Sequence, residues 1–421
     1  MPFALYMLGL AVFAQGTSEF MLSGLIPDIA ADLDVSVAAA GSLTSAFAVG
    51  MVVGAPLMAA LSLSWPRRRA LLAFLITFLC VHVLGALTTS YAVLVGTRVV
   101  GALANAGFLA VALAAATSMV APDAKGRATS VLLGGVTLAC VAGVPAGALL
   151  GTVWGWRSAF WAVAVVSVPA VVAIVRSVPD GDSVPGSGFG TSSGAGSGGA
   201  GRGAAAAALR AELGVLRRPR LLVTLLLGAL VNGATFCTFT YLATLATDVS
   251  EFGDAWVPGV LALFGAGSFL GVTAAGRLAD TRPVAVLTVG GTALLTGWVL
   301  FALTAGNPVA AAVLVLVQGT LSFAVGTTLI TRALYAGSDA PTLAGGFATA
   351  ALNVGAALGP TLGGLTLDTS LGHRAPLWVS ALLVGLAVVV GGAAEAVGRR
   401  SAAKGPAGAG GIAEQGVTRV S

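Results

Sequence analysis

The feature that most constrains the fold is a succession of long apolar runs along almost the whole chain. A helix needs about 20 apolar residues to cross the hydrocarbon core of a membrane. Six runs of this kind precede residue 177 and six follow residue 219. They cover 3–28, 39–63, 70–88, 91–118, 128–152, 157–176, 220–246, 256–276, 284–305, 308–332, 342–367 and 375–396. The pattern predicts an all-α integral membrane protein with twelve transmembrane helices.

Composition and charge support this interpretation. Charged residues make up 9% of the chain and the mean hydropathy is +0.98, whereas a soluble domain carries about 25% charged residues. With a cytoplasmic N-terminus, 18 of the 21 Lys and Arg residues fall on the cytoplasmic side, Arg157 and Arg374 fall outside, and Arg98 lies within a span. Basic residues favour cytoplasmic loops. We therefore expect a multi-pass plasma-membrane protein with both termini in the cytoplasm, and we read the net charge of +5 as topology rather than nucleic-acid binding.

The runs divide the chain into two six-helix halves, 1–176 and 220–397, joined by a linker at 177–219. The linker reads GDSVPGSGFGTSSGAGSGGAGRG, a composition that favours flexibility. A short interfacial helix is expected at its end, and a disordered cytoplasmic tail at 398–421. The stretches AALSLSWPRRRALL and GRLADTRPVAVL occupy equivalent places in the two halves, which indicates a pseudo-repeat.

Glu19 is the only acidic residue that falls well within any of the runs. A charged side chain near the middle of a bilayer costs about 2.5–3.5 kcal/mol on insertion scales. A carboxyl that takes up a proton avoids much of this cost, so Glu19 is a candidate for proton coupling. Gln15 lies one turn earlier on the same helix face. The alternative is a protonated Glu19 that only hydrogen-bonds a neighbouring helix.

Arg98 is the only base within a span, in the sequence RVVGALAN that ends at Asn105. An arginine inside a membrane needs a partner or a wet cavity. Glu19 is the acid available to it, directly or through water. The alternative is that Arg98 reaches for the outer interface along its aliphatic stem.

Polar amides within the runs predict a cavity for a small, partly apolar ligand. Amides can hydrogen-bond such a ligand while aromatic rings cover its apolar part. The candidate substrate-binding residues are Gln15, Asn105, Asn232, Phe236, Tyr241, Gln318 and Asn353, with Phe239 close to Asn232. The alternative for each amide is hydrogen bonding between packed helices.

Two glycine-containing motifs complete the pattern. The fifth run carries Gly143, Pro145, Gly147 and Gly151, where glycine spacing permits close helix approach and proline permits a kink. The connection after the eighth run carries Gly276, Asp280 and Arg282. The equivalent place in the first half has Ser64-Trp65-Pro66 before three arginines, so it lacks the acid.

These motifs resemble those of the major facilitator superfamily. The fifth-run glycines resemble the antiporter motif of its proton-driven drug exporters, although Val144 stands where the family favours glycine. The sequence around Arg98 resembles the motif whose arginine takes part in proton transfer, and Gly276, Asp280 and Arg282 resemble the cytoplasmic gating motif. With PRRRALLAFLITF, RVVGALANAGFLAVA and WGWRSAFW, the chain looks most like the actinobacterial chloramphenicol exporters.

The resemblance implies a proton-coupled antiporter, not an enzyme, that exports a small neutral drug such as chloramphenicol. Export of a sugar or other metabolite by the same mechanism is the alternative, and a membrane-embedded enzyme is a distant one. We expect a monomer in the lipid bilayer with protons and a small-molecule drug as partners, and with no cofactor, metal or nucleic acid. The three cysteines, Cys80, Cys140 and Cys237, are expected to be small core residues.

Overall fold

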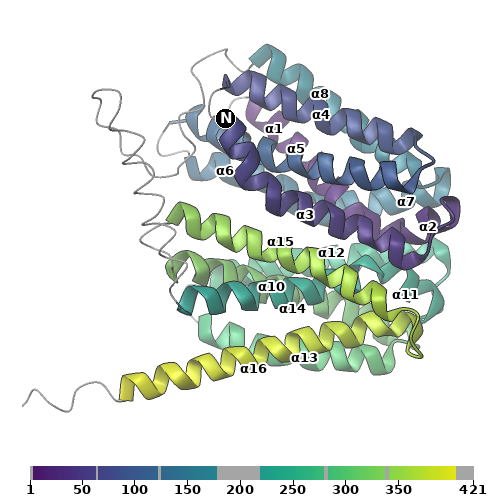
Figure 1. Ribbon diagram of the computed structural model, residues 1–421, viewed down its shortest axis with the longest axis vertical. Coiled ribbons are helices and arrows are strands. Elements are labelled where there is room, and N and C mark those ends of the chain that lie inside the picture. Colours follow the sequence, from purple (N-terminus) through teal and green to yellow (C-terminus); the bar gives the residue numbers. More distant parts are fainter. Residues whose placement is uncertain are drawn as a thin grey trace, which may run out of the picture.

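Long helices account for nearly all of the computed structural model (Figure 1), which describes residues 3–62, 65–121, 125–177, 219–278, 283–336 and 341–403. No strand occurs in these ranges. The first half contains α1 (Phe3–Phe20), a 3-10 turn η1 (Met21–Gly24), α2 (Ile26–Asp32), α3 (Val37–Ser62), α4 (Arg67–Leu87), α5 (Tyr91–Ser118), α6 (Lys125–Leu138), a π-helical turn η3 (Ala139–Gly143), α7 (Val144–Trp154) and α8 (Arg157–Ser177). The second half contains α10 (Pro219–Thr240), α11 (Leu242–Asp248), a 3-10 turn η5 (Asp254–Trp256), α12 (Val257–Leu278), α13 (Pro283–Thr304), α14 (Pro308–Ala336), α15 (Pro341–Thr366), a 3-10 turn η6 (Gly372–Arg374) and α16 (Ala375–Ala403).

Twelve segments run the length of the molecule. Eleven of the spans found in the described ranges are long and apolar enough to cross a membrane. The twelfth is α15, whose 26 residues pack alongside α3 and α10. The predicted all-α membrane fold with twelve spans is therefore confirmed. The predicted linker and interfacial helix lie almost wholly outside the described residues, as does most of the predicted tail. Helix α16 continues to Ala403, beyond the expected start of that tail.

Two spans predicted as single helices are broken. The first span leaves α-helical geometry after Phe20 and resumes at Ile26. Pro27 has no backbone N–H to donate to the preceding turn, so the helix restarts with this proline in its first turn. The seventh span pauses at Tyr241, whose N–H bonds Thr238 O at 3.2 Å in a tighter turn. Side chains before and after each break therefore do not lie on one continuous helix face, as the sequence predicts for an unbroken helix.

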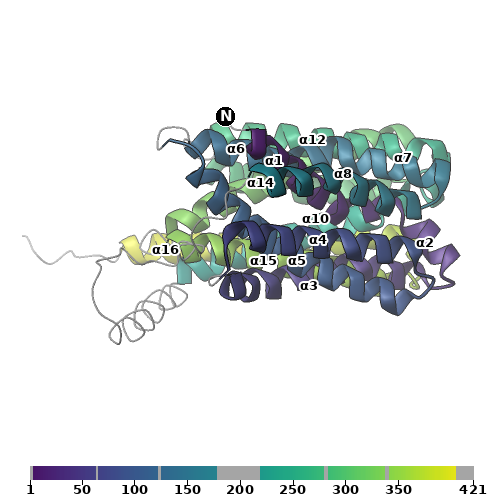
Figure 2. The same ribbon diagram turned by 90° about the horizontal axis from the view of Figure 1, so that it is seen from above.

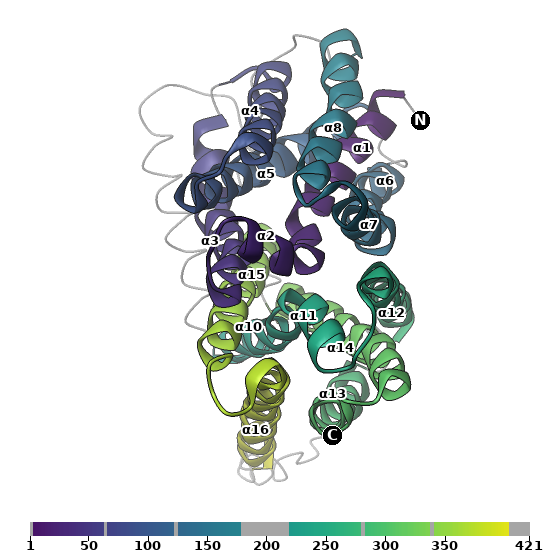
Figure 3. The same cartoon turned by 90° about the vertical axis from the view of Figure 1, so that its right-hand side faces the viewer.

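The helices run along a common direction (Figure 2) and gather into two groups that follow the chain order (Figure 3). The start of α1 and the end of α16 lie at the same end of the bundle (Figure 1). The opposite end, which carries α2, α11 and the end of α7, is called the far end below. At this end one polar pair joins two connections within each half. Arg157 pairs with Asp32 at 2.6 Å in the first half, and His373 pairs with Asp248 at 2.8 Å in the second.

The halves meet along two pairs of helices. Helix α3 packs on α15, where the hydroxyls of Ser45 and Thr361 are 3.0 Å apart. Helix α12 packs on η3 and α7, and the apolar core of the second half takes in Val144 and Ala148 of α7. These contacts bring α1, α7, α10 and α12 around one central region.

Candidate functional site

Glu19 lies in the last turn of α1, where the first span breaks. Its side chain is half-buried and is close enough to interact electrostatically with Arg98 and Cys140. The last carbonyls of a helix have no partner within the helix and carry a partial negative charge. The break therefore gathers negative potential at the same place as the carboxyl group.

Arg98 lies on α5 and is 2% exposed. Its Nη1 donates to Ser18 Oγ at 2.9 Å and its Nη2 donates to Ser18 O at 2.8 Å. Its guanidinium carbon is 4.5 Å from the ring centroid of Phe47. The alternative in which Arg98 extends to the outer interface is wrong, because the guanidinium is enclosed by α1 and α3. No salt bridge joins it to Glu19 among the described residues.

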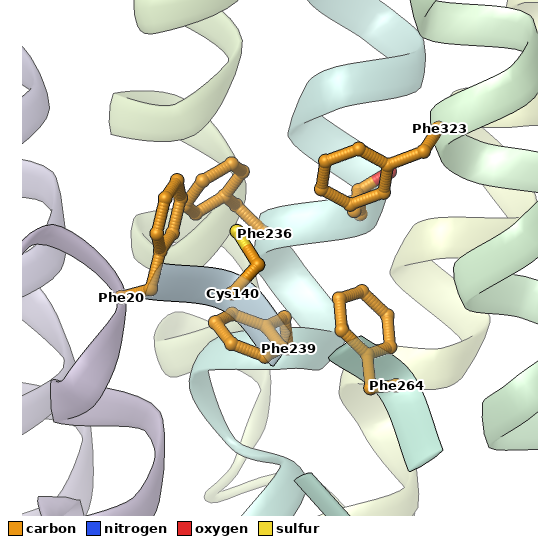
Figure 4. Close-up of a pocket in the computed structure, with 7 residues that line it drawn as sticks. Phe20, Cys140, Phe236, Phe239, Phe264 and Phe323 are labelled. Carbon is orange, nitrogen blue, oxygen red and sulfur yellow. The ribbon is translucent and has the colours of Figure 1, made fainter. Parts of the chain in front are cut away.

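A small aromatic pocket lies between the halves. It is lined by Phe20, Cys140, Thr235, Phe236, Phe239, Phe264 and Phe323. Figure 4 shows the five rings and the thiol arranged around one space. Phe239 stacks on Phe264 with centroids 4.6 Å apart. Cys140 of the pocket wall is close enough to the Glu19 carboxyl group to interact with it electrostatically, so the carboxyl group and the pocket share one region.

None of the five predicted amides lines this pocket. Three of them bond to a neighbouring helix, as in the packing alternative. Asn105 Nδ2 contacts Met51 Sδ at 3.5 Å, Asn232 Nδ2 donates to Leu352 O at 2.7 Å, and Gln318 Nε2 donates to Leu294 O at 3.1 Å. These bonds join different helix pairs, so these three side chains are not gathered around a common ligand site.

The other two amides differ from these three. Asn353 donates to Thr349 O on its own helix at 3.0 Å. Gln15 is 1% exposed and neither of its amide atoms has a hydrogen-bond partner among the described residues. Of the amides, Gln15 alone keeps its full hydrogen-bonding capacity, one turn from Glu19.

Of the two predicted aromatic residues, the structure places Phe236 in the pocket and Tyr241 elsewhere. Tyr241 donates its hydroxyl to Pro360 O at 2.8 Å and is 2% exposed. Its ring occupies a notch between α3 and α15: a Cβ at Gly364 would lie 2.6 Å from the hydroxyl, and one at Gly41 would also collide with the ring. Tyr241 therefore bridges the two halves.

The glycine motif of the fifth span packs against the first span. The π-helical turn η3 ends at Gly143, and Pro145 stands in the first turn of α7. Since Pro145 has no N–H to continue the ladder, the span changes its hydrogen-bond register here, at the kink that the sequence predicts. A Cβ at Gly143 would collide with Thr17. A Cβ at Gly151 would likewise collide with Leu25, and one at Gly147 would lie 3.2 Å from Met21 Cβ.

The gating motif is only partly described. Gly276 is exposed near the end of α12, whereas Asp280 and Arg282 lie outside the described residues. The cysteines are all free, but only Cys237 is buried as expected. The expectation is wrong for Cys80, which is exposed, and for Cys140, which lines the pocket. No group of residues that could hold a metal occurs in the described part of the chain.

Sequence reasoning missed Phe20, Cys140, Phe264 and Phe323 in the pocket, and Ser18 as the partner of Arg98. Apolar rings within apolar runs carry no local signal, since phenylalanine also faces lipid. The one available signal was adjacency: Ser18 and Phe20 flank Glu19, and Cys140 lies just before the glycine motif.

Comparison with known proteins gives consistent matches over most of the chain. The model of the Major Facilitator Superfamily matches residues 8–345. A chloramphenicol resistance protein of Streptomyces lividans is 56% identical over 390 residues, covering 93% of this chain and 95% of that protein. A chloramphenicol efflux pump of Mycobacterium tuberculosis is 30% identical over 391 residues, covering 91% and 90%. A solved structure of a bacterial homolog of the human lysosomal transporter Spinster, inward-facing and unoccupied, superposes with a TM-score of 0.66 at 18% identity, covering 92% of this chain and 93% of that one, which shows a shared fold.

Proposed function

This chain belongs to the major facilitator superfamily, and from that membership we propose that it exports chloramphenicol, or a closely related phenicol, in exchange for protons. The choice of substrate rests on the 56% identity to a chloramphenicol resistance protein across 93% of the chain. The protein is a multi-pass membrane transporter. We place it in the cell membrane as a monomer with cytoplasmic termini that moves its substrate without changing it chemically and needs no cofactor.

The side chains that line the aromatic pocket match the chemistry of the substrate. Chloramphenicol has a nitrophenyl ring at one end and hydroxyl and amide groups at the other. The pocket offers five phenylalanine rings and a single hydroxyl, that of Thr235. In this proposal the aromatic end lies among the rings, and the polar end lies toward Glu19, which interacts with Cys140 of the pocket wall. This lining disfavours a sugar, which needs several hydrogen-bonding side chains around it.

Glu19 carries the coupled proton. As a carboxylate it binds the polar end of the drug, and as a neutral acid it releases the drug. Arg98, held at Ser18 beside it, reduces the cost of the charged form. Exchange of one proton for one neutral drug moves one charge inward. This exchange gains about 2.3 kcal/mol per 100 mV of membrane potential, roughly a 50-fold concentration ratio.

The test is drug accumulation in inverted vesicles with an imposed pH gradient, for the wild type, Glu19→Gln and Glu251→Gln. Glu19→Gln resembles the protonated acid at every pH, so it should lose uphill accumulation and drug-induced proton release. Glu251 is exposed in a connection and serves as the matched control. If the Glu19→Gln variant still concentrates drug, and a protonophore still abolishes that drug accumulation, the coupling carboxyl group lies elsewhere. Asp28 is then the next residue to examine.

The substrate is tested separately by a drug-susceptibility profile in an efflux-deficient host. Expression should raise resistance to chloramphenicol more than to unrelated drugs. A host that stays fully sensitive to phenicols while the protein is present in its membrane would contradict the assignment.

A further inference from the structure

His82 lies in the interior of the first half, where its ring has two aromatic neighbours and a polar partner at each nitrogen. It is 2% exposed on α4, and its ring centroid is 4.1 Å from that of Phe78 and 5.8 Å from that of Phe160. Its Nδ1 is 2.6 Å from Phe78 O, and its Nε2 is 2.6 Å from Ser18 Oγ. From its place near the end of the third run, His82 is expected to be structural, and the proposed cycle does not use it.

These bonds determine the direction of each hydrogen atom. A carbonyl oxygen only accepts, so Nδ1 carries the proton that is donated to Phe78 O. In a neutral ring Nε2 is then an acceptor, and the Ser18 hydroxyl donates to it. A charged ring would place two cations on one hydroxyl oxygen, because Arg98 donates to the same atom.

Ser18 therefore presents its lone pairs, not its hydrogen, to Arg98. The guanidinium uses both terminal nitrogens on this residue, one on the hydroxyl at 2.9 Å and one on the carbonyl at 2.8 Å. That carbonyl belongs to the last turn of α1, where carbonyl groups have no helical partner. Phe47 covers the guanidinium from α3. Arg98 is thus held beside Glu19 without forming a salt bridge to it.

We propose that His82 is a positioning residue that keeps Arg98 on Ser18 and so prevents a direct ion pair between Arg98 and Glu19. The inference rests on the proposed coupling role of Glu19. A direct pair would hold the carboxylate in its charged form and slow the uptake of a proton in each cycle. The titratable and charged groups at this place in the described residues are Glu19, His82, Arg98 and Cys140.

Without His82 Nε2, the Ser18 hydroxyl loses the acceptor that fixes the direction of its hydrogen. The Ser18 hydroxyl is then free to turn its hydrogen toward Arg98, and a buried guanidinium that loses a bond needs another acceptor. Arg98 Nε already has no partner among the described residues. Glu19 is the acceptor with opposite charge beside it. The carboxylate form of Glu19 should become more favoured, opposite to the effect of removing Arg98.

The experiment measures chloramphenicol binding to the full-length purified protein as a function of pH, together with thermal stability. The variants are His82→Leu, Ser18→Ala and Arg98→Ala. His82→Gln offers a carboxamide oxygen in place of Nε2 and tests rescue. Ser23→Ala is the control, because Ser23 is a buried serine near the same break whose hydroxyl bonds Phe20 O instead.

We expect the pH midpoint of binding to fall by about one unit in His82→Leu and in Ser18→Ala, a tenfold change in the protonation equilibrium. Arg98→Ala should raise it, and adding His82→Leu to Arg98→Ala should cause no further shift. His82→Gln and Ser23→Ala should stay near the wild type.

A midpoint that is unchanged or raised in both His82→Leu and Ser18→Ala, while Arg98→Ala raises it, overturns the positioning role and leaves the proposed coupling intact. A loss of thermal stability without a shift in the midpoint has the same meaning. If Glu19→Gln keeps coupled export, the coupling assignment fails, and the positioning proposal fails with it.

Discussion

Phe20 of the first half and Phe236 of the second half contact each other in the wall of the pocket, with ring centroids 5.8 Å apart. Phe20 also meets Phe239 edge to face at 6.5 Å. The wall of the pocket is therefore built by both halves. Any movement of one half against the other changes its shape, as alternating access around a central site requires.

Replacing Phe236 by leucine tests the ring itself. Leucine keeps an apolar side chain but loses the aromatic face, so chloramphenicol should bind about fivefold more weakly, at ~1 kcal/mol for one aromatic contact. Phe301→Leu is the matched control, since Phe301 is 1% exposed and stacks on Trp298 outside the pocket. Binding to purified protein gives the affinities. Equal losses in both variants would mean that the effect is a general weakening of the second half.

Gly143→Ala should destabilise the first half because its methyl group meets Thr17. Overpacking of a well-packed region costs about 1–3 kcal/mol, so thermal unfolding should occur several degrees lower. Thr17→Ala, which removes the colliding hydroxyl and methyl, should recover part of the loss. Gly134→Ala is the control, because a Cβ there meets nothing within 4 Å. Identical melting of Gly143→Ala and Gly134→Ala would show that the contact is not tight.

Asp28 should make closure of the far end depend on pH. Partial burial, and then the nearby Asp254 carboxylate of the other half, raise the pKa of Asp28 above its usual value. When the halves separate at this end, the Asp254 carboxylate moves away and the pKa of Asp28 falls. The closed arrangement therefore binds the proton more tightly, so acid favours closure and rising pH favours opening.

The measurement for Asp28 is the distance between spin labels at Val153→Cys and Trp256→Cys, both exposed near the far end, in a background without the three native cysteines. Asp28→Asn should flatten the pH dependence and favour the closed distance. Asp34→Asn is the control in the same half. An unchanged pH slope in Asp28→Asn would assign the dependence to another group.

Tyr241→Phe separates a structural role of the Tyr241 hydroxyl from substrate binding. The variant loses the hydrogen bond to Pro360 O, about 1 kcal/mol. Because Pro360 lies on α15 in the same half as Tyr241, this bond does not cross the interface, and the ring that lies against Gly41 of α3 is kept. Thermal unfolding should therefore occur at a lower temperature, while the spin-label distance and the drug affinity stay at the wild-type values. A loss of affinity like that of Phe236→Leu would instead support the predicted substrate contact of Tyr241.

The sequence by itself determined the number and order of the spans and the presence of one acid and one base within them. Both are properties of the chain read along its length. Hydrocarbon thickness fixes how many apolar residues make a span, and the cost of a buried charge singles out Glu19 and Arg98. The position of Pro145 also indicated a kink in the fifth span, because a missing N–H is a local property.

Tertiary structure alone decided which side chains meet. Helix breaks at Phe20 and Tyr241 rotate the residues that follow, so Tyr241 reaches α15 instead of the pocket that holds Phe236. Asn232 and Gln318 donate to carbonyl groups of the helices that pack beside them. Arg98 bonds Ser18, not the acid next to it, because His82 on α4 supplies the acceptor that orients the Ser18 hydroxyl. The reason is physical: the face that a helix turns inward depends on the neighbours it packs against, and these lie far away in the sequence.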